Sequence, residues 1–220
     1  MTWNVRSLRD NRSAVVAAVR EIAPDVLFLQ EAPRFLRSAA KLAALARESG
    51  LVVGCGGRSA AGVGLLTSMR VDVDLALSTL LPATSGLHQR GVAVASLRLG
   101  GRAFAAASVH LGLEEAERVR HAKIISELLS DGPDLPAVLG GDLNETSDGQ
   151  AWATLADGAT DAGAAQNWPT FPARQPRRRI DAIFVPVGWR SVAVSPSDLV
   201  DDALLARATD HLPVIVDVVD

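Results

Sequence analysis

Short apolar stretches and helix-periodic stretches alternate along the whole chain. The stretch SAVVAAVREIAP places apolar residues at helical spacing from Val15 to Ile22 and ends at a proline. The stretch DVLFLQE has instead the length and composition of a buried strand. Later strands follow one another through short turns, as in RGVAVASLRLGGRAFAAASVHLG, where Gly100 and Gly101 mark a hairpin. This alternation predicts a mixed α/β (α+β) fold.

The hairpins decide between the architectures that such an alternation allows. In a doubly wound parallel sheet, neighbouring strands are joined by helical crossovers, and too many of these strands are joined by turns. We therefore expect two mostly antiparallel sheets packed face to face, with helices outside. No long linker, low-complexity tract or fixed-period repeat interrupts the pattern, so residues 1–220 are predicted to form one domain.

Composition narrows the possible partners and locations. The formal net charge of −3 gives the whole molecule no attraction to nucleic acid or to anionic membranes. No apolar run approaches the ~20 residues of a membrane span. The opening segment MTWNVRSLRD lacks the apolar region of a signal peptide, although a start inside a strand leaves open that upstream residues are missing. Cys55 is the only cysteine, so no internal disulfide can form. A cytoplasmic protein, with a monomer favoured, is expected.

Eight polar side chains follow or interrupt apolar stretches that should be buried. They are Asn4, Glu31, His110, Asp142, Asn144, Asp181, Asp210 and His211. Singly, each has a structural explanation: Asn4 could cap a turn, Asp142 with Asn144 could form an Asx turn, and Asp181 could pair with an arginine. Together they are harder to explain, because burying an unpaired charge is costly. A bound cation or mutual pairing would remove that cost.

The residue types indicate which cation would fit. Oxygen ligands without a cysteine or histidine cage suit a hard ion such as Mg²⁺ or Mn²⁺. His110 and His211 do not have zinc-finger spacing. We expect them to bind a phosphate or to transfer protons.

Six motifs occur in a fixed order between Thr2 and Val214: TWNV, LQE, SVHLG, GGDLNE, RRIDAIFV and TDHLPV. In this order they resemble the endonuclease/exonuclease/phosphatase superfamily, which includes DNase I-like nucleases, neutral sphingomyelinases and inositol-polyphosphate 5-phosphatases. GGDLN with the late Asp-His pair is the most specific part. The resemblance implies a DNase I-like four-layer α/β/β/α sandwich and a metal-dependent hydrolase of phosphate ester bonds.

The resemblance also implies a metal site. Glu31 would be the principal Mg²⁺ ligand, with Asn4 beside it and Asp210 contributing. The metal and two imidazolium-like donors would offset the negative charge of the phosphate and of the attacking water.

Catalytic roles follow from the same resemblance for five residues. Asp142 would orient or deprotonate the attacking water, and Asn144 would hold that water or a phosphate oxygen. His211 would stabilise the charge that develops on the scissile phosphate, and Asp181 would fix the tautomer of that ring. His110 would donate to the phosphate or to the leaving oxygen.

Three further residues are candidates for contact with substrate. Arg118 matches an arginine in a family stretch, although on a helix a solvent-facing role fits equally well. Thr170 and Arg179 belong to NWPTFPARQPRRRID, which either binds substrate or is a proline-stiffened connection with a solvated charge run. Trp168 in this loop is expected to pack. The chain has no tyrosine, and Ala182 stands where many relatives carry one, so the tyrosine-bearing nuclease branch is a poor match.

These observations predict a Mg²⁺-dependent phosphoesterase that acts on a phosphodiester or a phosphomonoester. A nuclease acting on DNA or RNA is one alternative, through local arginines, although the net charge does not favour nucleic acid. A non-catalytic protein that binds a phosphate ligand on the same scaffold is the other.

Overall fold

The computed structural model describes residues 1–219 and contains a four-stranded and a six-stranded sheet. The four-stranded sheet has the spatial order β1, β2, β4, β3. Its strands are β1 (Thr2–Asn4), β2 (Val26–Gln30), β4 (Val63–Thr67) and β3 (Val52–Gly57). Strands β1 and β2 run parallel, and the other neighbours are antiparallel.

The six-stranded sheet has the order β5, β6, β7, β8, β10, β9. Its strands are β5 (Asp72–Leu80), β6 (Gly91–Leu99), β7 (Arg102–His110), β8 (Ala137–Asp142), β10 (Asp181–Pro186) and β9 (Ala159–Asp161). Only β7 and β8 are parallel neighbours in it, joined through helix α3 (Glu115–Ser130). A separate pair, β11 (Arg190–Val194) and β12 (Ile215–Val219), is antiparallel.

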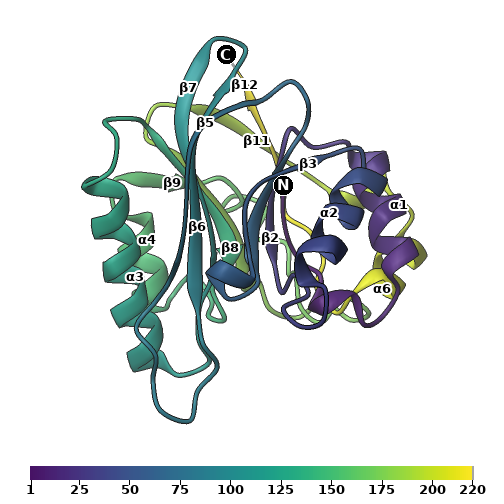
Figure 1. The fold of residues 1–220 in the computed structure, drawn as a ribbon, viewed down its shortest axis with the longest axis horizontal. Helices are drawn as coiled ribbons and strands as arrows, with labels where there is room; N and C mark the ends of the chain where they lie inside the picture. The colour runs from purple at the N-terminus through teal and green to yellow at the C-terminus, as the bar shows by residue number, and fades with distance from the viewer. Residues whose placement is uncertain (220) are drawn as a thin grey trace.

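Helices cover the outer face of each sheet, which confirms the predicted four-layer sandwich (Figure 1). The helices beside the four-stranded sheet are α1 (Arg12–Ile22), α2 (Ser38–Glu48) and α6 (Asp202–Ala208). Helix α3 and helix α4 (Gln150–Ala156) lie on the far side of the six-stranded sheet. A short helix, α5 (Pro196–Leu199), follows β11, and 3₁₀ turns cover Arg6–Leu8 and Arg58–Ala60.

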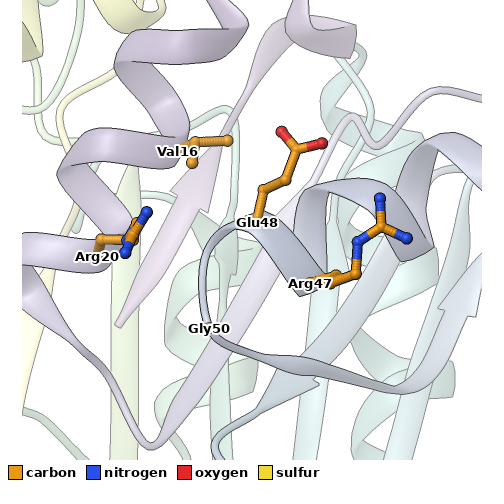
Figure 2. A pocket seen from close by; sticks show the side chains of 5 residues that line it. All are labelled: Val16, Arg20, Arg47, Glu48 and Gly50. Atoms are coloured by element: carbon orange, nitrogen blue, oxygen red, sulfur yellow. The ribbon is translucent and has the colours of Figure 1, made fainter.

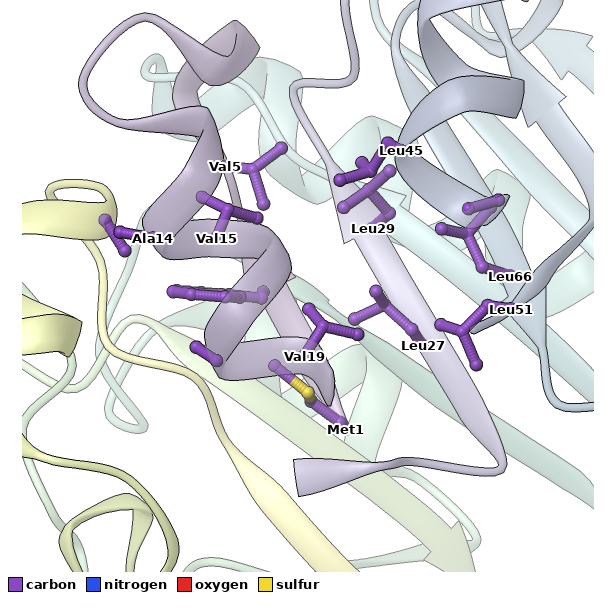
Figure 3. Close-up of a cluster of buried hydrophobic side chains, with 14 of the residues drawn as sticks. Met1, Val5, Ala14, Val15, Val19, Leu27, Leu29, Leu45, Leu51 and Leu66 are labelled. Carbon is purple, nitrogen blue, oxygen red and sulfur yellow. The ribbon is translucent and has the colours of Figure 1, made fainter. Parts of the chain in front are cut away.

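Three apolar clusters hold these layers together. Figure 3 shows Val15 and Val19 of α1 beside Leu27 and Leu29 of β2. A second cluster fills the space between the sheets, and a third packs α3 and α4 against the six-stranded sheet. Burial of apolar surface at roughly 25 cal/mol per Å² is the main force that holds such layers together.

The glycines of the GGDLN motif let the two sheets approach closely. A Cβ at Gly140 would lie 2.6 Å from the ring of Phe28 in the facing sheet, and one at Gly141 would lie 2.3 Å from the carbonyl oxygen of Val109. Both distances are too short for any side chain. Gly140 therefore lets β8 pack closely against β2 of the four-stranded sheet, and Gly141 lets it lie close to β7 within its own sheet.

Several local features depart from regular structure. Helix α2 begins only at Ser38, because Leu36 and Arg37 have φ angles of 40° and 56° and form a loop. The segment RSLRDNR begins with a turn in which Arg6, Ser7 and Leu8 all have positive φ. Sequence reading also missed β9, α5 and α6.

Two further observations concern the surface. Within residues 1–219, no helix has both the length and the apolar character that crossing a bilayer requires.

A hollow of about 390 Å³ lies between α1 and α2, where Arg20 and Val16 face Arg47, Glu48 and Gly50 (Figure 2). None of the eleven residues with a predicted site role lines this hollow.

Candidate active site

The predicted catalytic residues leave their strands at one edge of the packed sheets. In the six-stranded sheet, His110 pairs with Asp142 across β7 and β8, and Asp142 pairs with Asp181 across β8 and β10. In the other sheet, Asn4 is the last residue of β1, and Glu31 directly follows β2. Residues that are distant in sequence therefore lie at the same edge of the two packed sheets.

Asn4 connects the two sheets at this edge. Its Nδ2 donates to Asp142 Oδ2 at 2.9 Å and to Glu31 Oε1 at 3.2 Å. Its Oδ1 accepts from the backbone N–H of Arg6 at 3.0 Å. Asn4 is buried, so these bonds replace the water that its amide would otherwise need. The amide therefore fixes two carboxylates relative to each other.

A chain of hydrogen bonds orients His211. Its Nδ1 lies 2.9 Å from Asp181 Oδ2, and the hydroxyl of Thr170 donates to the same oxygen at 2.6 Å. The ring of Phe171 packs against the imidazole, with 4.9 Å between centroids. The other nitrogen, Nε2, points toward Asp142, whose Oδ2 lies 3.7 Å away. This arrangement leaves Nε2 for contact with a reacting group.

The charges in the cluster shift the pKa of both His211 and Asp142. Burial alone would lower the pKa of His211, but attraction and a hydrogen bond from Asp181 outweigh it and raise the pKa to about 9. Burial, followed by repulsion from Asp181, raises the pKa of Asp142 to about 7. His211 is thus an imidazolium at neutral pH, while Asp142 can exchange a proton there.

His110 differs from His211 in charge. Its Nε2 lies 3.1 Å from Asn144 Nδ2 and 3.4 Å from Asp142 Oδ2. Burial, together with the charge of Arg90, lowers the pKa of His110 well below its usual value. The site therefore contains one imidazolium and one neutral imidazole, instead of the two imidazolium-like donors expected from the sequence.

Unfavourable backbone conformations gather around the site. Glu31 has a φ of 52° and Asn144 a φ of 54°, in the left-handed region that non-glycine residues seldom adopt. The turn at Arg6 to Leu8 shares this conformation, and the backbone N–H of Ser7 donates to the carbonyl oxygen of Glu31 at 2.8 Å. Such strain concentrates where a site requires particular directions of side chains.

The oxygen-rich side of the cluster fits a hard divalent cation. Glu31 and Asp210 supply carboxylates, and Asn4 supplies an amide. These carboxylates already attract a cation: Arg6 Nε lies 3.3 Å from Asp210 Oδ2, and Asp210, Asp10 and Glu31 raise the pKa of Arg6. Oxygen donors of this kind are those that Mg²⁺ and Mn²⁺ prefer.

A second group of potential metal ligands lies deeper in the site. Asp142, Asp181 and His211 are buried and could hold a metal, with one ligand atom from each within 4.8 Å of the others. However, Asp181 Oδ2 already accepts from His211 and Thr170, so this trio also works as a hydrogen-bonded chain without a metal.

The three residues expected to contact substrate all have partners within the protein. Thr170 is a partner of Asp181, as described above. Arg118 pairs with Glu145 at 2.8 Å and donates to the carbonyl oxygen of Leu113 at 2.6 Å. Arg179 pairs with Asp161 at 2.5 Å and stacks on Trp152, with its guanidinium carbon 4.6 Å from the ring centroid. The contacts of Arg118 and Arg179 do not support the substrate-binding role expected of them.

The loop before β10 contains another difference from expectation. Trp168, expected to pack, is 42% exposed and lines a hollow of about 220 Å³ with Thr170, Arg179 and Leu212. Phe171, by contrast, contacts His211 directly. No local pattern in the sequence distinguishes these two aromatic residues, because both stand beside a proline in a polar loop.

A comparison with protein families decides the assignment of the chain. The sequence profile of the Endonuclease/Exonuclease/phosphatase family matches residues 1–211. The chain belongs to the endonuclease/exonuclease/phosphatase family. A search of curated protein sequences found no match.

Solved structures agree with this assignment at the level of the fold. A mannosyl-6-phosphatase from Bacteroides thetaiotaomicron is 20% identical, with a TM-score of 0.77 over 100% of this chain and 98% of that chain. A functionally unknown conserved protein from Enterococcus faecalis is 18% identical, with a TM-score of 0.76 over 99% and 98%. TDP2 from D. rerio, in complex with a single-strand DNA product, is 18% identical, with a TM-score of 0.70 over 96% and 94%.

Membership of the endonuclease/exonuclease/phosphatase family establishes the class of chemistry. The chain is a hydrolase that acts on phosphate ester bonds. The family generally depends on a divalent metal, and the buried acidic and histidine side chains of this chain could hold one.

Proposed function

We propose that this protein is a Mg²⁺-dependent phosphoesterase that hydrolyses a phosphodiester or a phosphomonoester by attack of water. One observation carries the proposal. Asn4, Asp142, Asp181 and His211 form one hydrogen-bonded and ion-paired cluster, although they come from both ends of the chain. Burying so many polar groups together is unfavourable for folding unless they pair, and a site for an anionic ester gives them a use.

Asp142 is proposed to remove a proton from the attacking water. Burial keeps its pKa near 7, so the carboxylate is basic enough to accept a proton at neutral pH. Asn4 Nδ2 and the backbone N–H of Asn144 each donate to one of its oxygens and fix its direction. General base catalysis of this kind contributes about 10²–10⁴ to a rate.

His211 is proposed to stabilise the charge that develops on the phosphate. Asp181 holds the proton on Nδ1 and keeps the ring cationic, so Nε2–H is a charged donor directed at the cluster. His110 and Asn144 are proposed to hold the phosphate or the leaving oxygen from the opposite side, where they already contact each other.

Mg²⁺ is proposed to bind at Glu31, Asn4 and Asp210, and Mn²⁺ to substitute for it. When bound, the ion would supply a Lewis acid that offsets the negative charge of the phosphate. Glu31 and Asp210 would hold it through carboxylates, and Asn4 would keep Glu31 in register with Asp142.

A screen of phosphate esters tests the proposal. We expect the purified protein to hydrolyse bis(p-nitrophenyl) phosphate or p-nitrophenyl phosphate with Mg²⁺ or Mn²⁺ and to lose this activity with EDTA. Sugar phosphates and single-stranded DNA belong in the same screen, because one structural neighbour is a sugar phosphatase and another was solved with a DNA product. A metal-loaded protein that binds phosphate esters without turning any of them over would instead be the non-catalytic binding protein.

A further inference from the structure

Arg90 occupies a fixed place beside the catalytic edge. It directly precedes β6, and Val92 of that strand pairs with Val109 of β7, so Arg90 and His110 leave neighbouring strands at the same edge. The carbonyl oxygen of Arg90 accepts from Leu81 N at 2.9 Å and from Gln89 Nε2 at 2.8 Å. These bonds hold the backbone of Arg90 in place.

The residue after Arg90 adds to this rigidity. A Cβ at Gly91 would lie 2.6 Å from the carbonyl carbon of Ala60 and 2.7 Å from the carbonyl oxygen of Thr79. Only glycine permits such an approach. The start of β6 is therefore packed tightly against its surroundings, and the position of the Arg90 side chain follows from a backbone that cannot easily shift.

The guanidinium of Arg90 is not fully paired within the part of the chain that the structure describes. Among residues 1–219, its Nε is buried without a hydrogen-bond partner, and none of the ion pairs formed within these residues includes its guanidinium. Arg34 nearby differs, because its Nη1 donates to the carbonyl oxygens of Ala61 and Gln89, at 3.4 Å each. A half-buried cation without a counterion is costly, and buried donors are seldom left unpaired in folded proteins.

The charges of the cluster and the charge of Arg90 act on each other. Burial lowers the pKa of Arg90, and among the carboxylates that oppose this, Asp142 has the largest effect, ahead of Glu117 and Glu31. After burial, Arg90 is also the charge that most lowers the pKa of His110. These effects agree with the strand register, which brings Arg90 and His110 to the same edge of the sheet.

We propose that Arg90 binds an oxygen of the substrate's phosphate group on the His110 side of the site. This inference rests on the proposed function, because it takes a phosphate ester as the substrate. Guanidinium groups form forked, charge-assisted hydrogen bonds with phosphate oxygens. In this role Arg90 supplies the cationic donor that the neutral His110 cannot supply, in addition to the imidazolium of His211.

The Arg90→Met variant tests the inference, with Arg190→Met, an exposed arginine of β11, as the matched control. Thermal unfolding is measured in Mg²⁺ with and without about 10 mM inorganic phosphate. We expect phosphate to raise the Tm of the wild type and of Arg190→Met, but not of Arg90→Met. The KM for p-nitrophenyl phosphate should rise about 10- to 100-fold in Arg90→Met and about 3- to 10-fold in Arg90→Lys.

The stability of the ligand-free variant separates substrate binding from a structural role. Because Arg90 has no partner to lose, Arg90→Met should unfold at the same temperature as the wild type or higher. If Arg90 instead pairs with Glu117, whose Oε1 is also buried and unpartnered, the variant will unfold several degrees lower. That result, an unchanged KM, or a wild type whose Tm does not respond to phosphate would overturn the inference.

The measurements distinguish an error in the proposed function from an error in the role of Arg90. A wild type that binds phosphate through Arg90 but hydrolyses no ester would contradict only the proposed function. An active wild type whose Arg90→Met variant keeps its KM and its response to phosphate would contradict only the role of Arg90. An Arg90→Met variant that does not fold would also contradict the inference, because its unfolding would show that Arg90 has a structural partner.

Discussion

His211 Nδ1 and Asp181 Oδ2 lie 2.9 Å apart in a buried hydrogen bond. Asp181 belongs to β10, while His211 lies thirty residues later, between α6 and β12. The hydroxyl of Thr170 completes the arrangement by donating to the same oxygen of Asp181, and the backbone N–H of Ile180 donates to Thr170 Oγ1 at 3.2 Å. The direction of the imidazole therefore depends on a loop that does not itself contact a reacting group.

Thr170→Val tests this dependence. Valine has nearly the shape of threonine but cannot donate to Asp181, so the carboxylate should hold His211 less firmly. We expect kcat to fall by about 10-fold with little change in KM, because Thr170 acts through His211 and not on the substrate. Thr170→Ser, which keeps the hydroxyl, should restore most of the rate. A KM effect that equals the kcat effect would instead favour direct contact with substrate.

The pH dependence of stability provides a test that needs no substrate. Asp142 has a pKa of about 7 in the folded protein, against an ordinary value of 3.8. Between these values the unfolded chain has released the proton while the folded protein keeps it, so the wild type loses stability as the pH rises. Asp142→Asn cannot titrate and should not show this loss.

Chemical denaturation in EDTA measures the difference. Between pH 4.5 and 6.5, the unfolding free energy of the wild type should fall relative to that of Asp142→Asn by about 2–3 kcal/mol. The window lies below the ordinary pKa of histidine, so the raised pKa of His211 contributes little within it. Parallel pH profiles for the two proteins would show that Asp142 ionises normally in the folded state.

Some residues of the candidate site could be predicted from the sequence, because they belong to a recognisable strand or motif, and others could not. Asp142 and Asp181 stand at the ends of apolar strands and His211 lies in the Asp-His motif, so strands and motifs in the sequence predicted that these side chains come together. Arg179 precedes Asp181 by only two residues, but its partner Asp161 belongs to β9, a three-residue strand that no pattern revealed. The position of Arg179 close to Asp181 in sequence therefore did not predict where its side chain lies.

Other features depend on packing between distant segments. The two sheets and their helices followed from strand length and hairpin turns, which are local properties. The contact of Phe171 with His211, and an Arg90 Nε that has no partner within residues 1–219, arise from how loops pack against each other. No local pattern encodes such contacts, so only the three-dimensional arrangement distinguishes Phe171 from Trp168 or Arg90 from Arg34.

Arg179 should contribute to stability. It is buried, with two hydrogen bonds to Asp161, one to Asn167 and a stacking contact with Trp152. Arg179→Ala leaves Asp161 without its partner and should lower the unfolding free energy by about 3–5 kcal/mol. The double variant Arg179→Ala/Asp161→Ala should be less destabilised than the sum of the single variants. An Arg179→Ala protein of wild-type stability with a raised KM would instead restore the substrate-binding role.

Cys55 should be unreactive in the folded protein. Its thiol lies in the cluster between the sheets, donates to the carbonyl oxygen of Val94 at 3.6 Å, and has a pKa that burial raises to about 11. At pH 8 the reaction with a thiol reagent such as DTNB should be at least about 100-fold slower than in denaturant, because the thiolate is scarce and shielded. Rapid stoichiometric reaction of the native protein would contradict this packing between the sheets.

Glu31 and His211 are the two residues whose joint action tests the account most directly. The measurement is kcat for bis(p-nitrophenyl) phosphate with saturating Mg²⁺, in Glu31→Gln, His211→Ala and the double variant. Each single variant should lose about 10³-fold or more, and the double variant far less than the product of the two losses, because both side chains serve one reaction centre. Either single variant turning over at the wild-type rate would contradict the account.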